Sequence, residues 1–168
     1  MNKKVLIDAN ILQYATNPQY ADGIYKLFNE LKLLSYDMMV SSYTTFEVYR
    51  GLDSKRVPKM KQVIALFKPN ETDLRCFSLA AALDTCYRRH EATKAFASRY
   101  SDGDLVLAGS SFHYNSPILT ANGNDFPRPF FIELQQVALG TLSRHMPMRV
   151  QLLMPNIAFF NTTIKQYY

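Results

Sequence analysis

KVLIDANIL, residues 4–12, joins a short apolar run to an aspartate and, two positions later, an asparagine. The apolar residues at positions 5–7 are typical of a strand that is buried on both faces of a sheet. Asp8 ends this run, and the residues from Asn10 onward have helical spacing. Ligands of a parallel α/β sheet bind outside the carboxyl ends of its strands, so this stretch predicts a carboxylate at such an edge.

Strands and helices alternate along the first 126 residues. Short apolar runs predict strands at residues 3–7, 38–41 and 118–120. Helical spacing predicts the intervening helices, which are expected at residues 10–34, 44–51, 58–67, 72–90 and 105–112. This alternation implies βαβ units, and therefore a three-layer α/β/α sandwich around a central, mostly parallel sheet.

The last quarter of the chain follows a less definite pattern. Residues 130–139 and residues 148–155 are each suited to the next strand, and residues 156–168 are apolar and aromatic. The pattern does not order these segments. We expect a single domain over residues 1–168, with a core at residues 3–126 and a C-terminal extension of uncertain structure at residues 127–168.

The composition is that of a soluble globular protein, with 48% hydrophobic and 20% charged residues in a chain of 168. No apolar run approaches the ~20 residues that a membrane span needs, and the N-terminus lacks a signal-peptide pattern. We therefore expect a cytoplasmic protein without a membrane partner. The net charge of +5 weakly favours a polyanionic partner such as nucleic acid.

The two cysteines predict buried thiols rather than a disulfide. Cys76 and Cys86 fall in one expected helix, where ten residues span roughly 15 Å. A disulfide needs Cα atoms within about 7 Å of each other. Neither cysteine has the neighbouring Cys or His in sequence that is typical of a zinc site.

Four acids lie at the ends of expected elements. Asp8 follows the first strand, and Glu47 lies early in the helix after the second. Asp104, with Asp102 beside it, starts the helix before the third strand, and Asp125 follows that strand by five residues. If these acids converge, their mutual repulsion favours a divalent cation, and hard oxygen ligands suit Mg²⁺ or Mn²⁺.

Each acid also has a local structural explanation. Asp8 is placed to cap the helix that begins near residue 10, and Glu47 to complete a capping box with Thr44. Asp102 or Asp104 is placed to be the N-cap of its helix. The fourth acid lies in the polar sequence ANGND, which is typical of a turn.

The four acids stand in four sequence blocks that resemble those of the PIN-domain ribonucleases, and most of all the VapC-type toxins. VLIDANIL resembles the first block, with its acid at Asp8 and a small polar residue at Asn10. SSYTTFEVYRGL resembles the second, with its acid at Glu47. DLVLAGSS resembles the third, which selects Asp104 over Asp102.

ILTANGNDF resembles the fourth block of the family, with Thr120, Asn122, Asp125 and Phe126 at matching spacing. The resemblance covers residues 3–126, and the chain continues for about forty residues beyond it, which is longer than such toxins usually run. The blocks say nothing about that extension.

The resemblance implies a metal-dependent endoribonuclease that is the toxin of a toxin–antitoxin pair. It implies an RNA substrate, Mg²⁺ or Mn²⁺ as cofactor, a cognate antitoxin and a homodimer. The catalytic and metal-binding residues would be Asp8, Glu47, Asp104 and Asp125. The supporting polar residues would be Asn10, Thr120 and Asn122, together with Asp102, whose part is not assigned.

A basic cluster after the second block is the expected track for the RNA backbone. It comprises Arg50, Lys55, Arg56, Lys59 and Lys61. A second cluster comprises Arg88, Arg89 and Lys94. For both, a solvated helix face is an equal alternative. Tyr14 and Tyr49 are suited either to stacking on RNA bases or to packing in the core or on the surface, and packing is favoured.

Other function classes share some of these features. A phosphotransferase of the haloacid dehalogenase type needs a second Asp two residues after the first, where this chain has Asn10. A receiver domain needs adjacent acids near its start. The remaining alternatives are a catalytically inactive PIN-fold module that binds nucleic acid or a protein partner, and a PIN-type nuclease that acts on DNA or structured substrates.

Overall fold

The structure, a computed structural model, describes residues 3–139 and 147–167. In these residues six strands form one sheet in the order β3-β2-β1-β4-β6-β5. The strands are β1 (Lys3–Ile7), β2 (Tyr36–Ser41), β3 (Lys68–Asn70), β4 (Ile118–Thr120), β5 (Phe131–Leu139) and β6 (Met148–Pro155). The first four are parallel, whereas β6 runs antiparallel to β4 and β5 antiparallel to β6.

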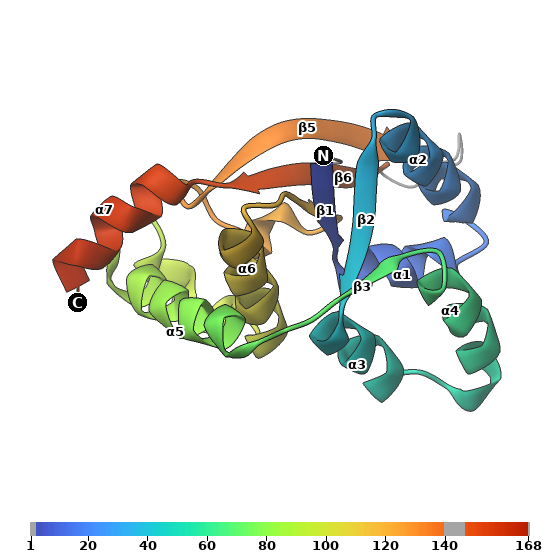
Figure 1. The fold of residues 1–168 in the computed structure, drawn as a ribbon, viewed down its shortest axis with the longest axis horizontal. Coiled ribbons are helices and arrows are strands. Elements are labelled where there is room, and N and C mark those ends of the chain that lie inside the picture. The colour runs from blue at the N-terminus through green and yellow to red at the C-terminus, as the bar shows by residue number, and fades with distance from the viewer. Residues whose placement is uncertain (1–2, 140–146, 168) are drawn as a thin grey trace.

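Helices cover both faces of this sheet. Figure 1 shows α1 (Ala9–Ala15), α2 (Ala21–Leu33) and α4 (Val57–Ile64) on one side, and α5 (Leu74–Arg89), α6 (Asp102–Tyr114) and α7 (Ile157–Tyr167) on the other. The helix α3 (Ser42–Arg50) follows β2 directly at the edge of the sheet. Short 3₁₀ turns η1 (Ser54–Arg56), η2 (Lys94–Arg99) and η3 (Gly123–Asp125) complete the connections. The predicted α/β/α sandwich with a mostly parallel sheet is confirmed.

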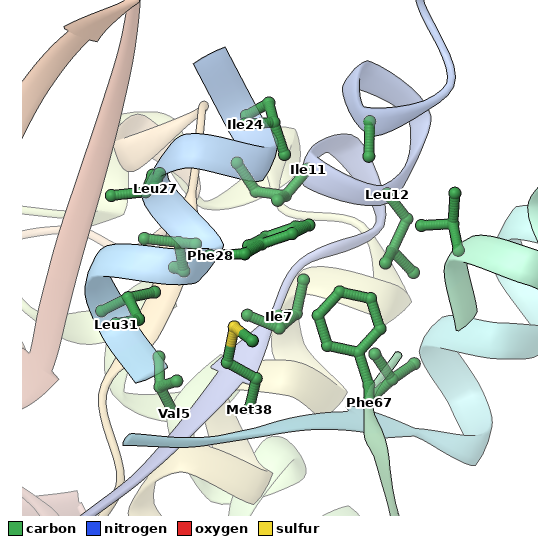
Figure 2. Packing of buried hydrophobic residues seen from close by; sticks show 14 of the residues in the cluster. Val5, Ile7, Ile11, Leu12, Ile24, Leu27, Phe28, Leu31, Met38 and Phe67 are labelled. Atoms are coloured by element: carbon green, nitrogen blue, oxygen red, sulfur yellow. The ribbon is translucent and has the colours of Figure 1, made fainter. Parts of the chain in front are cut away.

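The strand at the start of the chain is buried on both faces, as its apolar run predicts. Val5 and Ile7 pack on the side of α1 and α2, while Leu6 points to the opposite side and packs with residues of α5 and α6. Figure 2 shows Val5 and Ile7 beneath Phe28 and Leu31 of α2. Alternation along a strand thus supplies both hydrophobic layers from three consecutive residues.

Two of the predicted helical segments contain a break or an additional element. The segment at residues 10–34 is two helices, because Pro18 lies in the connection and lacks the N–H that a continuous helix requires. The helix predicted at residues 58–67 ends at Ile64 and is followed by β3, which was not predicted. β3 is three residues long, includes Pro69 and lies at the edge of the sheet, where proline is tolerated.

The buried face of α5 is formed by small and apolar residues. Leu74 and Phe77 are 80% and 43% exposed, and the buried stripe consists of Cys76, Ala80, Leu83 and Cys86. α6 packs against this stripe so closely that a Cβ atom on Gly109 would overlap the carbonyl oxygen of Cys76. Both cysteines are buried free thiols, as predicted.

The extension after Phe126 completes the sheet and contributes buried residues to both hydrophobic layers. Both candidate segments are strands, β5 and β6, and the aromatic tail is α7, which buries Phe160. β6 pairs with β4 and therefore lies between β4 and β5. Among the described residues, no helix is both long enough and apolar enough to cross a membrane.

Candidate active site

Asp8 lies at the carboxyl edge of the sheet, where β1, β2 and β4 all end. It is buried, with 6% of its surface exposed, and its Oδ2 accepts hydrogen bonds from Asn10 Nδ2 at 2.6 Å and from Thr120 Oγ1 at 2.7 Å. Asp8 occupies the N-cap position of α1 but makes no side-chain capping hydrogen bond. Asp8 is therefore at the predicted cap position, and the side chains of Asn10 and Thr120 hold its carboxylate.

The predicted supporting residues link the start of α1 to the loop after β4. Asn10 Oδ1 accepts from the backbone N–H of Ala121 at 3.0 Å, and Thr120 Oγ1 accepts from the N–H of Asn122 at 2.9 Å. Asn122 Nδ2 in turn donates to Asp125 Oδ2 at 2.6 Å. These bonds join Asp8 to Asp125 through a continuous set of polar side chains.

Glu47 lies on α3 and takes no part in a capping box, so that expectation is wrong. α3 begins two residues earlier than predicted, and its N-cap is Ser41, whose Oγ accepts from the N–H of Thr44 at 2.9 Å. The half-buried Glu47 carboxylate lies directly against Gly103 at the start of α6, where a Cβ atom would overlap it. A carboxylate at a helix N-terminus is favoured by the helix dipole.

Asp104 is the N3 residue of a capping box, and the N-cap is Ser101 rather than Asp102 or Asp104. The Oδ2 atom of Asp104 accepts from Ser101 N at 2.9 Å and from Ser101 Oγ at 2.7 Å. Both bonds use one oxygen, so the second oxygen is not needed for capping. Asp102 is exposed in the first turn of the helix.

Asp125 closes the 3₁₀ turn η3 and is half-buried. The predicted polar turn is present, since Asp125 N donates to Asn122 O at 3.2 Å. Its carboxylate nevertheless interacts electrostatically with Asp104 and Asp8, which lie on other elements. The turn and the grouping of acids therefore occur together.

The four acids share one negative field. Burial, opposed by the Thr120 hydrogen bond and reinforced by the charge of Asp104, raises the pKa of Asp8 to about 6. Burial together with the charges of Asp104 and Asp8 raises the pKa of Glu47 to about 7, although Arg50 opposes the shift. The same two charges and burial raise the pKa of Asp125 to about 7.

No Lys or Arg among the described residues lies within 4 Å of these four carboxylates to neutralise them. The donors that the site offers are hard carboxylate oxygens, and the charge that they leave uncompensated is negative. Both properties fit a divalent cation such as Mg²⁺ or Mn²⁺.

A different group of side chains has its potential metal-ligand atoms closer together than the four acids have. In the described part of the chain, Asp73, Cys76 and His113 are the one such group with ligand atoms within 4.8 Å of one another, so the four acids are spaced more widely. Cys76 thus has a His neighbour in space, although it has none nearby in the sequence. Asp73 caps α5 by accepting from Cys76 N at 3.0 Å, and His113 Nε2 lies 3.7 Å from its Oδ2. Along α6, His113 is about 14 Å from Asp104.

The two basic clusters differ in their contacts. In the first, Lys59 Nζ donates to Thr16 O at 3.0 Å and Arg56 Nη2 to Thr16 Oγ1 at 3.4 Å. All five of its side chains are exposed. In the second cluster each basic residue has a partner within the protein. Arg88 forms an ion pair with Asp84 and Lys94 with Glu91, and Arg89 donates a hydrogen bond to the backbone carbonyl of Tyr167. Tyr14 and Tyr49 pack against the hydrophobic core.

A pocket of about 480 Å³ adjoins the acids. Its wall includes Asp125, two residues of η2 (Phe96 and Arg99), Tyr100, and residues of the β5–β6 hairpin. Burial and the charge of Asp125 raise the pKa of Tyr100, which places the tyrosine close to the acids. No sequence motif predicts this pocket, because its lining comes from the segments on either side of α6 and from the extension.

Comparison with known proteins bears on the fold. No protein-family model and no curated protein matches the sequence. The fold is similar to a chain in the crystal structure of VapBC2 from Rickettsia felis bound to a DNA fragment from their promoter. The TM-score is 0.52 at 20% sequence identity, over 73% of this chain and 90% of that chain. The chain therefore has a PIN-like α/β fold.

Proposed function

We propose that this protein is a metal-dependent endoribonuclease and the toxin of a toxin–antitoxin pair. The observation that carries the proposal is the grouping of Asp8, Glu47, Asp104 and Asp125 at the carboxyl edge of the sheet, where the charges of Asp8 and Asp104 act on both Glu47 and Asp125. Acids that share one field without a cationic partner raise the cost of one another's ionised form, and a bound divalent cation would remove that cost.

Asp8, Glu47, Asp104 and Asp125 would hold one or two Mg²⁺ or Mn²⁺ ions. When bound, such ions would supply hydroxide near neutral pH and offset the negative charge of the phosphodiester. The expected products of hydrolysis carry a 5′-phosphate and a 3′-hydroxyl.

The protein's own residues fix the carboxylates. Thr120 and Asn10 orient Asp8 through its Oδ2, and Asn122 orients Asp125. Ser101 orients Asp104, while contact with the start of α6 places Glu47. Each acid thus has a neighbour that limits its rotation, as metal ligands require.

The proposed partners follow from the structural neighbour and from charge. The similar chain comes from a structure of VapBC2, which supports an antitoxin partner for this protein. A homodimer is proposed from the resemblance of the four sequence blocks to the VapC-type toxins, and a cytoplasmic location from the composition. Arg50, Lys55, Arg56, Lys59 and Lys61 are the proposed contacts to the RNA backbone, because all five are exposed.

An inactive binding module and a nuclease that acts on DNA or structured substrates are the alternatives. Labelled single-stranded RNA, single-stranded DNA and duplex DNA incubated with the protein and Mg²⁺ separate the three. We expect RNA cleavage that EDTA stops and that Asp8→Asn abolishes with a nearly unchanged thermal melt. Cleavage of DNA alone selects the second alternative, and RNA binding without cleavage selects the first.

A further inference from the structure

We propose that the pocket between η2, η3 and the β5–β6 hairpin is a subsite for one unpaired RNA nucleotide next to the scissile phosphate. The inference deepens the proposed function and rests on it. Asp125 belongs both to the acid group and to the wall of the pocket, so a chain held at the acids reaches the pocket within one nucleotide. A volume of about 480 Å³ is within the range of small-molecule sites.

The pocket wall includes one exposed and one partly buried aromatic ring. Phe96 is 46% exposed, and the guanidinium of Arg99 lies 4.9 Å from the centre of its ring. Tyr100 also lines the pocket and packs against Tyr87 at 5.0 Å between ring centres. Unpaired bases stack on such rings, and a guanidinium plane prolongs the stack.

Positive charge stands at the rim of the pocket, which suits a phosphate. Arg99 has no acidic partner within 4 Å in the described ranges. Arg128 is 77% exposed and lies 3.9 Å from Glu133. Both cations line the pocket that also contains Asp125 of the acid group, so a phosphodiester held at the acids can pair with them, whereas an apolar ligand would leave Arg99 without an anionic partner.

The C-terminal extension contributes a polar pair suited to a base edge. Gln151 Nε2 on β6 donates to Glu133 Oε2 on β5 at 2.5 Å. The β-sheet register shifts between Glu133 and Gln135, and such bulges re-aim side chains beside active sites. The Gln151 amide also lies against Gly123 of η3, where a Cβ atom would overlap it. The pair therefore connects the hairpin to the turn that contains Asp125.

The substrate choice of the enzyme would then come from the hairpin rather than from the acids. An amide and a carboxylate together provide donors and acceptors for the edge of one base. We expect the preference to concern a single nucleotide position, immediately beside the cleaved bond.

RNA binding is measured in the Asp8→Asn background with Mg²⁺, so that the RNA remains intact. The probe is a fluorescent decanucleotide with the preferred cleavage site of the parent protein, or a random decanucleotide pool if the parent does not cleave. We expect Phe96→Ala to weaken binding about tenfold. Arg99→Gln should weaken it similarly and reduce the salt slope by about one. Arg75→Gln, an exposed arginine on α5 outside the pocket, is the matched control and should change neither quantity.

Cleavage by Gln151→Leu in the otherwise unchanged protein tests selection. We expect the base preference at one nucleotide position beside the cut to change when a random RNA pool is cleaved. The total cleavage rate should change little. If the parent cleaves RNA but the Phe96 and Arg99 variants bind within twofold of it and Gln151→Leu cuts the same sites, the inference is wrong. If these variants lose binding of poly-L-glutamate instead, the pocket is a peptide site and the inference is equally wrong. Absence of cleavage by the parent, with Phe96-dependent RNA binding intact, contradicts the proposed function alone.

Discussion

Asp8 is the most deeply buried of the four acids, and its surroundings explain how an ionised carboxylate can be held there to bind a cation. The carboxylate is buried, and two neutral donors, Thr120 and Asn10, converge on one oxygen. Neutral hydrogen bonds stabilise the ionised form without cancelling its charge. The charge therefore remains available to a cation.

Replacing Thr120 by valine removes one of these donors with little change in shape. We expect a loss of about 1–3 kcal/mol of folding stability, because a buried acceptor loses its partner. Activity should fall about 10- to 100-fold, and its pH dependence should shift upward, since the Thr120 hydrogen bond lowers the pKa of Asp8. Chemical denaturation and a pH series of RNA cleavage measure the two effects.

Thr120→Ser is the matched control for this change. It retains the hydroxyl that donates to Asp8, so its pH profile should coincide with that of the parent. Equal profiles for the Val and Ser variants would remove Thr120 from any role in positioning Asp8.

At the scale of elements, the start of α6 brings two of the acids together. Asp104 is fixed there by the capping box, and Gly103 leaves the space that the Glu47 carboxylate of α3 occupies. Alanine is a better helix former than glycine by about 1 kcal/mol, so a Gly103→Ala change would stabilise α6 if no contact were lost.

We expect Gly103→Ala to lower RNA cleavage about 10- to 100-fold, because the added methyl group displaces Glu47 from the acid group. Cleavage and circular dichroism, measured together, test this effect. Gly51→Ala is the matched control, since a Cβ atom there meets nothing within 4 Å. Full activity in the Gly103 variant would show that Glu47 does not act from its observed position.

The sequence predicts these elements better than it predicts their contacts. The apolar run at residues 5–7 and the positions of the acids after strands suffice to predict the parallel sheet and its carboxyl edge. The cap position of Asp8 was predicted correctly, whereas the capping assignments for Glu47 and Asp104 were wrong because cap positions depend on where a helix begins to within one residue. The pocket was missed since its walls come from η2, η3 and the β5–β6 hairpin, which only the tertiary fold brings together.

At the scale of the whole molecule, the acids couple stability to pH. The ordinary pKa of these side chains is about 4 in the unfolded chain, whereas Asp8 has a pKa of about 6 and Glu47 and Asp125 of about 7 when folded. Between pH 4 and pH 7 the folded protein thus retains protons that the unfolded chain has lost. The free energy of unfolding must therefore fall as pH rises through this window and level off above it.

Thermal melts in EDTA at intervals between about pH 5 and pH 8 measure this dependence. We expect these groups to lower the melting temperature as the pH rises to about 7. Mg²⁺ should restore the melting temperature at the upper end of the pH range, because it binds the folded protein with ionised acids. Asp8→Asn should flatten the decrease. Asp102→Asn, which removes an exposed carboxylate beside the group, should leave the slope as it is. A slope that Asp8→Asn does not alter would contradict the shared field.

Binding of Mn²⁺ to the intact protein, measured by calorimetry near pH 7.5, tests most directly whether residues 8, 47, 104 and 125 form a cation site. The account predicts binding that weakens at least about tenfold in Asp8→Asn and is unchanged in His113→Gln, which alters the separate group at the far end of α6. Binding that survives Asp8→Asn and disappears in His113→Gln would contradict it.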